Sequence, residues 1–243
     1  MSAPARPSWS RERQAAARGF RTVAGIDEVG RGALAGPVVA AAVVLDPDRC
    51  PDGVRDSKTL TGAARERLYA AIVATARAWG IGLAEAGEID ATNILEATRC
   101  AMLRAVAAMS LRPDYLIVDA VPLPETGLPF EAPFKADRDV LSVAAASIVA
   151  KVTRDRILVD LDAELPGYGF AAHKGYGTRE HFAAIAARGP SAAHRRTFAG
   201  MGEGSLWIGE KWGGWAPPGA AGRGRYPKGP AASKLPPGGR GRR

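Results

Sequence analysis

Adjacent acids, Asp27 and Glu28, end an apolar run and are followed at once by a Gly-Arg-Gly turn at residues 30–32. Two carboxylates held close together repel, and one takes up a proton unless a cation lies between them. Oxygen-only ligands favour Mg2+ or Mn2+ over zinc, which prefers His or Cys. An acid pair can equally cap a strand in solvent. The two glycines allow backbone N–H groups to approach a ligand and Arg31 supplies positive charge, so the segment favours a phosphate-bearing substrate beside a metal.

Two further acids are candidates for the same kind of site. Asp119 follows the short apolar run at residues 115–118, and acids at the carboxyl ends of parallel strands are common places for chemistry. Asp137 lies in a Lys-Ala-Asp segment just before an alanine-rich helical stretch. An acid in that position is often a helix N-cap, so the residues alone favour Asp137 little more than Asp139.

Apolar patterning predicts the elements that must position these acids. Residues 22–29 and 37–45 are expected to be adjacent antiparallel strands joined by the glycine turn. Further strands are predicted at 79–86 and 115–119, and helices at 63–78, 88–109 and 139–164. The order of these elements predicts an α/β fold, with a mixed sheet of about five strands and helices packed on its faces.

Composition and charge divide the chain into three parts. Of the 33 basic residues, eight lie in residues 211–243, which contain no acid, so the preceding 210 residues carry equal numbers of bases and acids. Residues 1–20 are predicted to be a flexible basic lead-in. Residues 21–210 are predicted to form the folded domain with a C-terminal helical part, and residues 211–243 a disordered basic tail rich in Gly, Pro and Arg. The net charge of +8 therefore says little about the folded domain.

Cysteine usage and hydropathy bear on location. Cys50 and Cys100 lack CxxC spacing, so neither a disulfide framework nor a zinc knuckle is indicated. The N-terminus lacks the apolar segment of a signal peptide, and no apolar run is long enough to cross a bilayer. We expect a cytoplasmic protein without a membrane partner.

The motifs, taken in order, resemble bacterial ribonuclease HII, a type 2 ribonuclease H, over roughly residues 20–200. The resemblance rests on GIDEVGRG at 25–32, DSK at 56–58, EIDATNI at 88–94, VD at 118–119, KAD at 135–137, residues 144–155, and YGFAAHKGYG at 168–177. It implies a ribonuclease H-like fold for the folded domain. It also implies metal-dependent hydrolysis of the phosphodiester on the 5′ side of a ribonucleotide, leaving a 3′-hydroxyl and a 5′-phosphate.

The resemblance assigns roles to particular residues. Asp27, Glu28, Asp119 and Asp137 would be the four catalytic, metal-binding carboxylates, and a pair of Mg2+ or Mn2+ ions can promote in-line displacement without a protein nucleophile. Adjacent residues of a regular strand face opposite ways, so Glu28 can share the site with Asp27 only if the strand ends or bends there.

Recognition of the substrate would fall to a second group of residues. RNA differs from DNA in its 2′-hydroxyl, so a reader of single ribonucleotides must surround that group. The resemblance assigns substrate binding to the backbone of the glycine turn, to two phosphate-gripping residues and to an aromatic residue that stacks on the neighbouring sugar: Gly30, Arg31, Gly32, Ser57, Lys58 and Tyr176. Arg195 and Arg196 could also reach phosphates, whereas His173 receives no role.

The expected partners are RNA/DNA hybrids and duplex DNA that contains ribonucleotides, and the implied roles are ribonucleotide removal and RNA primer degradation during DNA replication and repair. A monomer is expected, and no protein-docking peptide is recognisable in the tail. Three alternatives stay open: a sister enzyme that requires a run of ribonucleotides, a nucleic-acid-binding protein without catalysis, and a small-molecule phosphohydrolase. Ala33, Ala120 and Ala136 depart from the family pattern, where proline, glycine and glycine are usual, but none of these changes removes a carboxylate.

Overall fold

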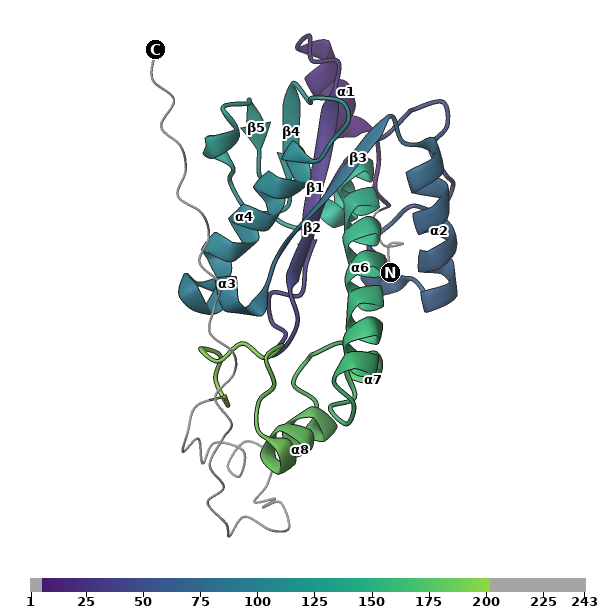
Figure 1. The fold of residues 1–243 in the computed structure, drawn as a ribbon. Helices are drawn as coiled ribbons and strands as arrows, with labels where there is room; N and C mark the ends of the chain where they lie inside the picture. The colour runs from purple at the N-terminus through teal and green to yellow at the C-terminus, as the bar shows by residue number, and fades with distance from the viewer. Residues whose placement is uncertain (1–5, 202–243) are drawn as a thin grey trace, which may run out of the picture.

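A five-stranded mixed sheet forms the centre of the molecule (Figure 1), and the computed structural model describes residues 6–201. The strands are β1 (Val23–Val29), β2 (Val38–Val44), β3 (Ala78–Ala84), β4 (Tyr115–Val118) and β5 (Phe130–Glu131), in the spatial order β3-β2-β1-β4-β5. β1 is antiparallel to β2 and β2 to β3, whereas β4 runs parallel to both β1 and β5. The predicted mixed sheet of about five strands is confirmed.

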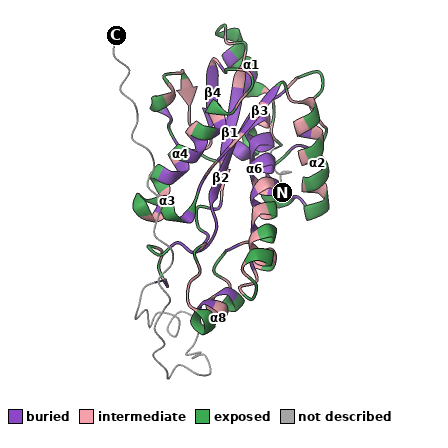
Figure 2. Cartoon of the chain, in the orientation of Figure 1, coloured by how far each residue is buried: buried purple, intermediate pink, exposed green. Residues whose placement is uncertain are grey.

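The sheet is covered by a helix on each face, and Figure 2 shows the strands buried between them. α4 (Ile94–Ala107) packs on β2 and β3, and the long α6 (Leu141–Glu164) packs on β1 and β2 with α2 (Gly62–Thr75) beside it. β2 is buried along its whole length, which suits its uninterrupted Val and Ala sequence. Half of the buried residues of α6 are Ala or Ser, and these small side chains let the helix lie close to the sheet.

Glycine makes this close packing possible on both faces of the sheet. A Cβ on Gly25 of β1 would lie 2.2 Å from the backbone of Ser142 in α6. A Cβ on Gly82 of β3 would lie 2.1 Å from the carbonyl oxygen of Ala101 in α4. Both gaps are too small for any side chain, so these helix positions depend on glycine in the strands.

Shorter elements complete the described chain. They are α1 (Ser10–Ala17), the 3-10 turns η1 (Ser57–Thr59) and η2 (Pro124–Thr126), α3 (Ala86–Ala91), α5 (Ala136–Asp139), α7 (Phe170–His173) and α8 (Arg179–Arg188). In Figure 1, α7 and α8 lie beyond the end of the sheet at which β1 ends.

The structure corrects the prediction for the helix at 88–109 and for the lead-in at 1–20. The helix predicted at 88–109 is divided into α3 and α4, because the Asn93 side chain accepts the N–H groups of Leu95 and Glu96 and so caps a new helix. The flexible lead-in predicted at 1–20 is wrong for residues 10–17, which form α1. Buried Glu12 of α1 accepts hydrogen bonds from the N–H and hydroxyl of Ser142, at the start of α6.

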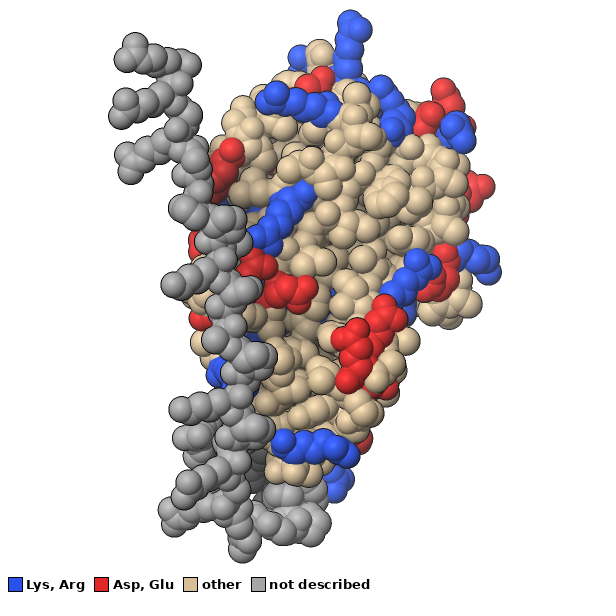
Figure 3. Space-filling view, viewed as in Figure 1, with Lys and Arg blue, Asp and Glu red and all other residues tan. Residues whose placement is uncertain are grey.

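The basic tail predicted at 211–243 lies outside the described residues. On the face shown in Figure 3, Lys and Arg side chains of the described part are interspersed with Asp and Glu. None of the helices in residues 6–201 is long and apolar enough to cross a membrane.

Candidate metal and nucleic-acid site

Asp27 and Glu28 lie on opposite faces at the end of β1. The pairing of β1 with β2 stays regular through this point, with Asp27 opposite Ala41 and Glu28 opposite Ala40. Asp27 therefore faces α6, and its side chain is 5% exposed. β1 stays regular through Glu28 to Val29, so no bend brings Glu28 to the face of Asp27, and the chain turns at Gly30, whose φ is 98°.

Asp119 and Asp137 lie beside Asp27. The N–H of Asp119 donates to the carbonyl of Ile26 at 3.0 Å, which places the end of β4 level with Asp27. The Asp119 carboxylate accepts the N–H of Ala136 at 2.9 Å, and this contact holds the start of α5 against it. Asp137, in the first turn of α5, is 3% exposed. The structure thus brings the three aspartates together on the α6 side, with Glu28 next to them across the strand.

The acids act on one another electrostatically. Burial raises the pKa of Asp27 well above its usual value, and Glu28, Asp119 and Asp137 raise it further against a hydrogen bond from Ser147. Burial and Asp119 raise the pKa of Glu28, although Arg31 opposes them. Burial and then Asp137 raise the pKa of Asp119, although the N–H of Ala136 opposes them. Buried carboxylates that disfavour one another's charge are typical of a site that takes up a cation.

The Asp-Ser-Lys turn at residues 56–58 places one positively charged side chain, that of Lys58, beside this cluster. The Nζ of Lys58 lies 3.5 Å from the carboxylate of Asp137. Burial works against its charge, but Asp137, Asp56 and Asp27 outweigh that effect and raise the pKa of Lys58. Lys58, predicted to grip a substrate phosphate, thus lies beside the acids with most of its side chain open to solvent.

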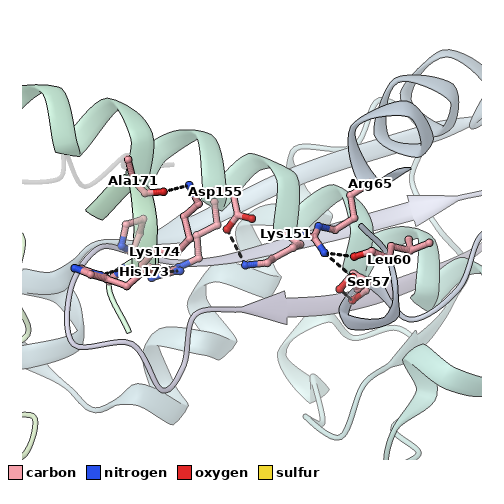
Figure 4. A network of polar contacts seen from close by, with 12 residues as sticks. Ser57, Leu60, Arg65, Lys151, Asp155, Ala171, His173 and Lys174 are labelled. Atoms are coloured by element: carbon pink, nitrogen blue, oxygen red, sulfur yellow. Dashed lines mark hydrogen bonds and ion pairs between the residues drawn. The ribbon is translucent and has the colours of Figure 1, made fainter. Parts of the chain in front are cut away.

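Ser57 lies deeper than a phosphate-gripping residue would. It is 4% exposed, and its hydroxyl lies 3.0 Å from that of Ser147, which itself hydrogen-bonds to Asp27. Arg65 of α2 donates to the carbonyls of Ser57 and Leu60, and these contacts fix the turn in place (Figure 4). Ser57 thus supports Asp27 through Ser147.

The Gly-Arg-Gly turn leaves β1 beside the acids. Arg31 donates to the carboxylate of Glu28 at 3.3 Å. Gly30 cannot be replaced freely, because a Cβ there would lie 2.1 Å from the Nε of Arg154, whereas a Cβ on Gly32 would meet nothing within 4 Å. Gly32 therefore presents an open backbone to the outside. Ala33 donates its N–H to the carbonyl of Gly30 at 3.3 Å, a bond that proline could not make.

Tyr176 is joined to this turn through main-chain contacts. The carbonyl of Gly175 accepts the N–H groups of Leu34 and Ala35, at 2.8 and 3.3 Å. The Tyr176 ring, 36% exposed, lies with its centroid 5.4 Å from the guanidinium carbon of Arg154. The two predicted parts of the ribonucleotide reader are therefore one connected surface.

Two buried arginines underlie this surface, and the sequence did not identify this role for either. Arg154 donates to the carbonyls of Ala35, Pro37 and Lys174, at 2.9 to 3.0 Å. Arg195 is fully buried and donates to the carbonyls of Gly36 and Arg31, so the expectation that it could reach phosphates is wrong. From sequence alone, an arginine among polar residues is expected to lie on the surface. Its burial cannot be predicted when its hydrogen-bond partners are backbone carbonyls, because every residue has one.

Three further residues near the site, Asp90, Asp155 and Ala120, have structural roles. The N–H groups of Arg196 and Thr197 donate to Asp90, which fixes the segment after Arg195. Asp155 pairs with Lys151 one turn away on α6 at 2.7 Å, in keeping with the structural role predicted for it (Figure 4). Ala120 adopts a φ of 56°, the left-handed region that favours the glycine usual at this position.

The chemistry of the acidic cluster fits a hard divalent cation. Its donors are all carboxylate oxygens, and one of them, Oε2 of Glu28, is buried without a hydrogen-bond partner. Within residues 6–201, no three acid, His or Cys side chains are close enough to encircle an ion as they stand. In this arrangement Asp137 pairs with Lys58, Glu28 pairs with Arg31, and Asp119 accepts the N–H of Ala136.

Solved structures place the fold in a class. The ribonuclease H2 from Pyrococcus horikoshii OT3 matches with a TM-score of 0.65 and 29% identity, covering 79% of this chain and 98% of that one. The ribonuclease HII of Archaeoglobus fulgidus, solved in complex with PCNA, matches with a TM-score of 0.63 and 31% identity over 73% of this chain and 95% of its own. The molecule is therefore an α/β protein with the ribonuclease H-like fold.

Sequence comparison narrows the class further. The family model for ribonuclease HII matches residues 24–201. A ribonuclease HII from Nitrosococcus oceani is 55% identical over 177 residues, covering 72% of this chain and 88% of that protein. One from Geobacter sulfurreducens is 54% identical over 198 residues, 80% of this chain and 90% of that protein. The chain belongs to the ribonuclease HII family and is an endoribonuclease of the ribonuclease H type, as the resemblance of its motifs implied.

Proposed function

We propose that this protein hydrolyses the phosphodiester on the 5′ side of a ribonucleotide, both in RNA/DNA hybrids and at single ribonucleotides embedded in duplex DNA. The products are a 3′-hydroxyl and a 5′-phosphate. The proposed roles are removal of misincorporated ribonucleotides and degradation of RNA primers, by a monomer in the cytoplasm. The coarser activity, that of a ribonuclease H, follows from family membership.

The observation that carries this proposal is the group of buried acids at the ends of two neighbouring strands. Asp27, Asp119 and Asp137 share one side of the sheet and Glu28 adjoins them. Burial, and then the charges of neighbouring acids, raise the pKa values of Asp27, Glu28 and Asp119. Such a cluster repels a phosphate as it stands. It serves a nucleic-acid enzyme only when cations neutralise it, which argues against a protein that merely binds nucleic acid.

Asp27, Glu28, Asp119 and Asp137 would hold one or two Mg2+ or Mn2+ ions. When bound, divalent ions supply an activated water and stabilise charge on the phosphate and the leaving oxygen. The residues of the chain would orient this reaction. Ser147 keeps Asp27 in place through its hydroxyl, and the Ala136 N–H fixes Asp119. The Lys58 side chain is largely exposed, so its ammonium group would exchange Asp137 for a substrate phosphate.

Recognition of the ribonucleotide is assigned to the surface formed by Gly30, Arg31, Gly32 and Tyr176. The open backbone at Gly32 can approach a 2′-hydroxyl, which both donates and accepts hydrogen bonds. The half-exposed Tyr176 ring can stack against the adjoining sugar. Arg31 would turn from Glu28 to the nucleic-acid backbone once the acids bind a cation.

The test uses three labelled duplexes: DNA with one ribonucleotide, all-DNA, and an RNA/DNA hybrid. Wild type with Mg2+ or Mn2+ should cut the first on the 5′ side of the ribonucleotide, cut the hybrid at many positions and leave the all-DNA duplex intact. Asp27→Asn should abolish cutting, whereas Asp139→Asn, a matched exposed acid two residues from Asp137, should not. Cutting of the hybrid alone would point to the sister enzyme that needs a run of ribonucleotides. Binding without cutting would overturn the proposed activity.

A further inference from the structure

All three histidines of the chain lie together beneath the Tyr176 loop. The rings of His173 and His181 stack with centroids 4.1 Å apart and planes 17° apart. His181 and His194 are almost completely buried, and their Nε2 atoms lie 3.0 Å from each other. Nothing in the proposed chemistry uses these rings, so their arrangement needs another explanation.

Hydrogen-bond partners fix the tautomer of each ring. His194 accepts the Ser191 N–H at Nδ1, 2.9 Å away, so its proton is on Nε2. That proton is donated to the Nε2 of His181, whose own proton must then be on Nδ1. The Nδ1–H of His181 donates to the carbonyl of Tyr176 at 2.9 Å. The bonds therefore run in one direction, from Ser191 through His194 and His181 to Tyr176.

His173 is bound on the other side of the same loop. Its Nε2–H donates to the carbonyl of Tyr168 at 2.8 Å, which leaves Nδ1 to accept the N–H of Gly175 at 3.2 Å. The carbonyl of His173 accepts the N–H of Tyr176 at 3.0 Å. Imidazole rings thus hold the peptide groups on both sides of Tyr176, and every ring is satisfied in its neutral form.

Burial keeps the relay neutral. Burial lowers the pKa of His181 to about 4 and His173 lowers it further, although the hydrogen bond to the Tyr176 carbonyl opposes them. Burial also lowers the pKa of His194 to about 4, and His181 and Arg196 add to this effect. A proton added to Nε2 of His181 would point at the Nε2–H of His194, and a proton added to Nδ1 of His194 would point at the Ser191 N–H. The one-way chain is therefore the single arrangement available at neutral pH.

We propose that His181, held by His194, is a positioning residue that fixes Tyr176 against the Gly-Arg-Gly turn and so sets the preference for a single ribonucleotide. The neighbouring Gly175 carbonyl binds Leu34 and Ala35, so a shift of this loop changes the separation between Tyr176 and the turn. This inference rests on the proposed function. A hybrid offers ribose on several successive nucleotides, so its binding depends less on the exact position of Tyr176. An isolated ribonucleotide offers a single ribose, so its recognition depends on the separation between Tyr176 and the Gly-Arg-Gly turn.

The experiment compares His181→Phe, His181→Asn and the matched control Ala187→Asn, on an exposed turn of α8. His181→Phe keeps an aromatic ring and loses both bonds, so kcat/KM should fall about ten-fold more on the single-ribonucleotide duplex than on the hybrid. His181→Asn can still donate to Tyr176 and should recover part of this loss. Ala187→Asn should leave the ratio of the two substrates unchanged. An equal fall on both substrates would overturn the proposal and leave a purely structural role.

Two further measurements keep the outcomes distinct. In a Tyr176→Ala background, His181→Phe should no longer change the ratio of kcat/KM between the two substrates, because its effect passes through Tyr176. A further change in that background would count against the proposal.

Nitrogen NMR of the three imidazoles in the wild type should show the Nδ1–H form for His181 and the Nε2–H form for His173 and His194. Any other assignment would refute the relay even if His181→Phe does not fold. Failure of the wild type to cut a single ribonucleotide would instead overturn the proposed function.

Discussion

Removing the charge of Asp27 is expected to stabilise the protein while it abolishes cleavage. The carboxylate is buried and raised in pKa by burial, Glu28, Asp119 and Asp137. An asparagine at this position can still accept the N–H of Glu28 and can donate to the hydroxyl of Ser147. The substitution therefore removes repulsion and keeps the local hydrogen bonds.

The magnitude follows from Coulomb's law. Two unit charges about 5 Å apart repel by about 3 kcal/mol at an effective dielectric constant of about 20. Lys58 and Arg31 already offset part of this repulsion. We expect Asp27→Asn to raise the free energy of unfolding by about 1–3 kcal/mol in metal-free buffer, which corresponds to a rise in Tm of about 2–12 °C for a chain of this size. Its kcat should fall by about 10²–10³-fold or more.

Thermal and urea unfolding in chelator, followed by the same scans with Mg2+, would measure this effect. Mg2+ should raise the Tm of the wild type more than that of Asp27→Asn, because only the wild type keeps all four carboxylates. Asp90→Asn is the contrasting control: Asp90 accepts N–H groups of Arg196 and Thr197, hydrogen bonds that lower its pKa, so its neutralisation should lower Tm. A loss of stability in metal-free Asp27→Asn would refute the reasoning about repulsion.

Three other predictions concern stability. The pKa values of His181 and His194 are about 4 each against 6.5 in the unfolded chain, so the unfolded state takes up protons first. The contribution of these two rings to stability should be constant above pH 6.5 and fall towards pH 4, by up to about 3 kcal/mol for each ring, while the raised pKa values of the acids act in the opposite direction. Urea titrations should therefore show a steeper decline for the wild type than for His181→Phe across this range, and equal slopes would contradict the prediction. Gly30→Ala should lower the free energy of unfolding by about 2–4 kcal/mol, because the φ of Gly30 is 98° and a Cβ there would clash with the buried guanidinium of Arg154. Gly32→Ala should change it by less than about 0.5 kcal/mol, because a Cβ there meets nothing within 4 Å. Equal losses of stability in urea unfolding of the two variants would contradict this difference in packing. Ala120→Gly should stabilise by about 0.5–1 kcal/mol by relieving a left-handed alanine, and a fall in Tm would argue against strain at that residue.

The sequence predicted the sheet and its covering helices because the apolar runs are long and distinct. It located the acids because an Asp-Glu pair beside Gly-Arg-Gly is an unusual combination. It missed the break at Asn93, where one side chain begins a new helix inside a continuous helical pattern. It also missed α1, whose tertiary bond from Glu12 to Ser142 joins residues 130 positions apart.

Contacts to the main chain account for most of what the sequence could not predict at the site. The roles of Arg154 and Arg195 depend on carbonyl groups that any residue possesses. The regular pairing at Glu28, which sends its side chain to the opposite face from Asp27, depends on the register with β2. Such features arise from tertiary geometry and leave little trace in residue type or spacing.

The most direct test of the proposed metal centre is anomalous diffraction from crystals of the full chain soaked in Mn2+. The account predicts anomalous density bordered by the carboxylates of Asp27, Asp119 and Asp137 and adjoining Glu28, with the Lys58 ammonium displaced from Asp137. Mn2+ bound only elsewhere, or an acidic cluster that stays paired with Lys58 and Arg31 at saturating Mn2+, would contradict it.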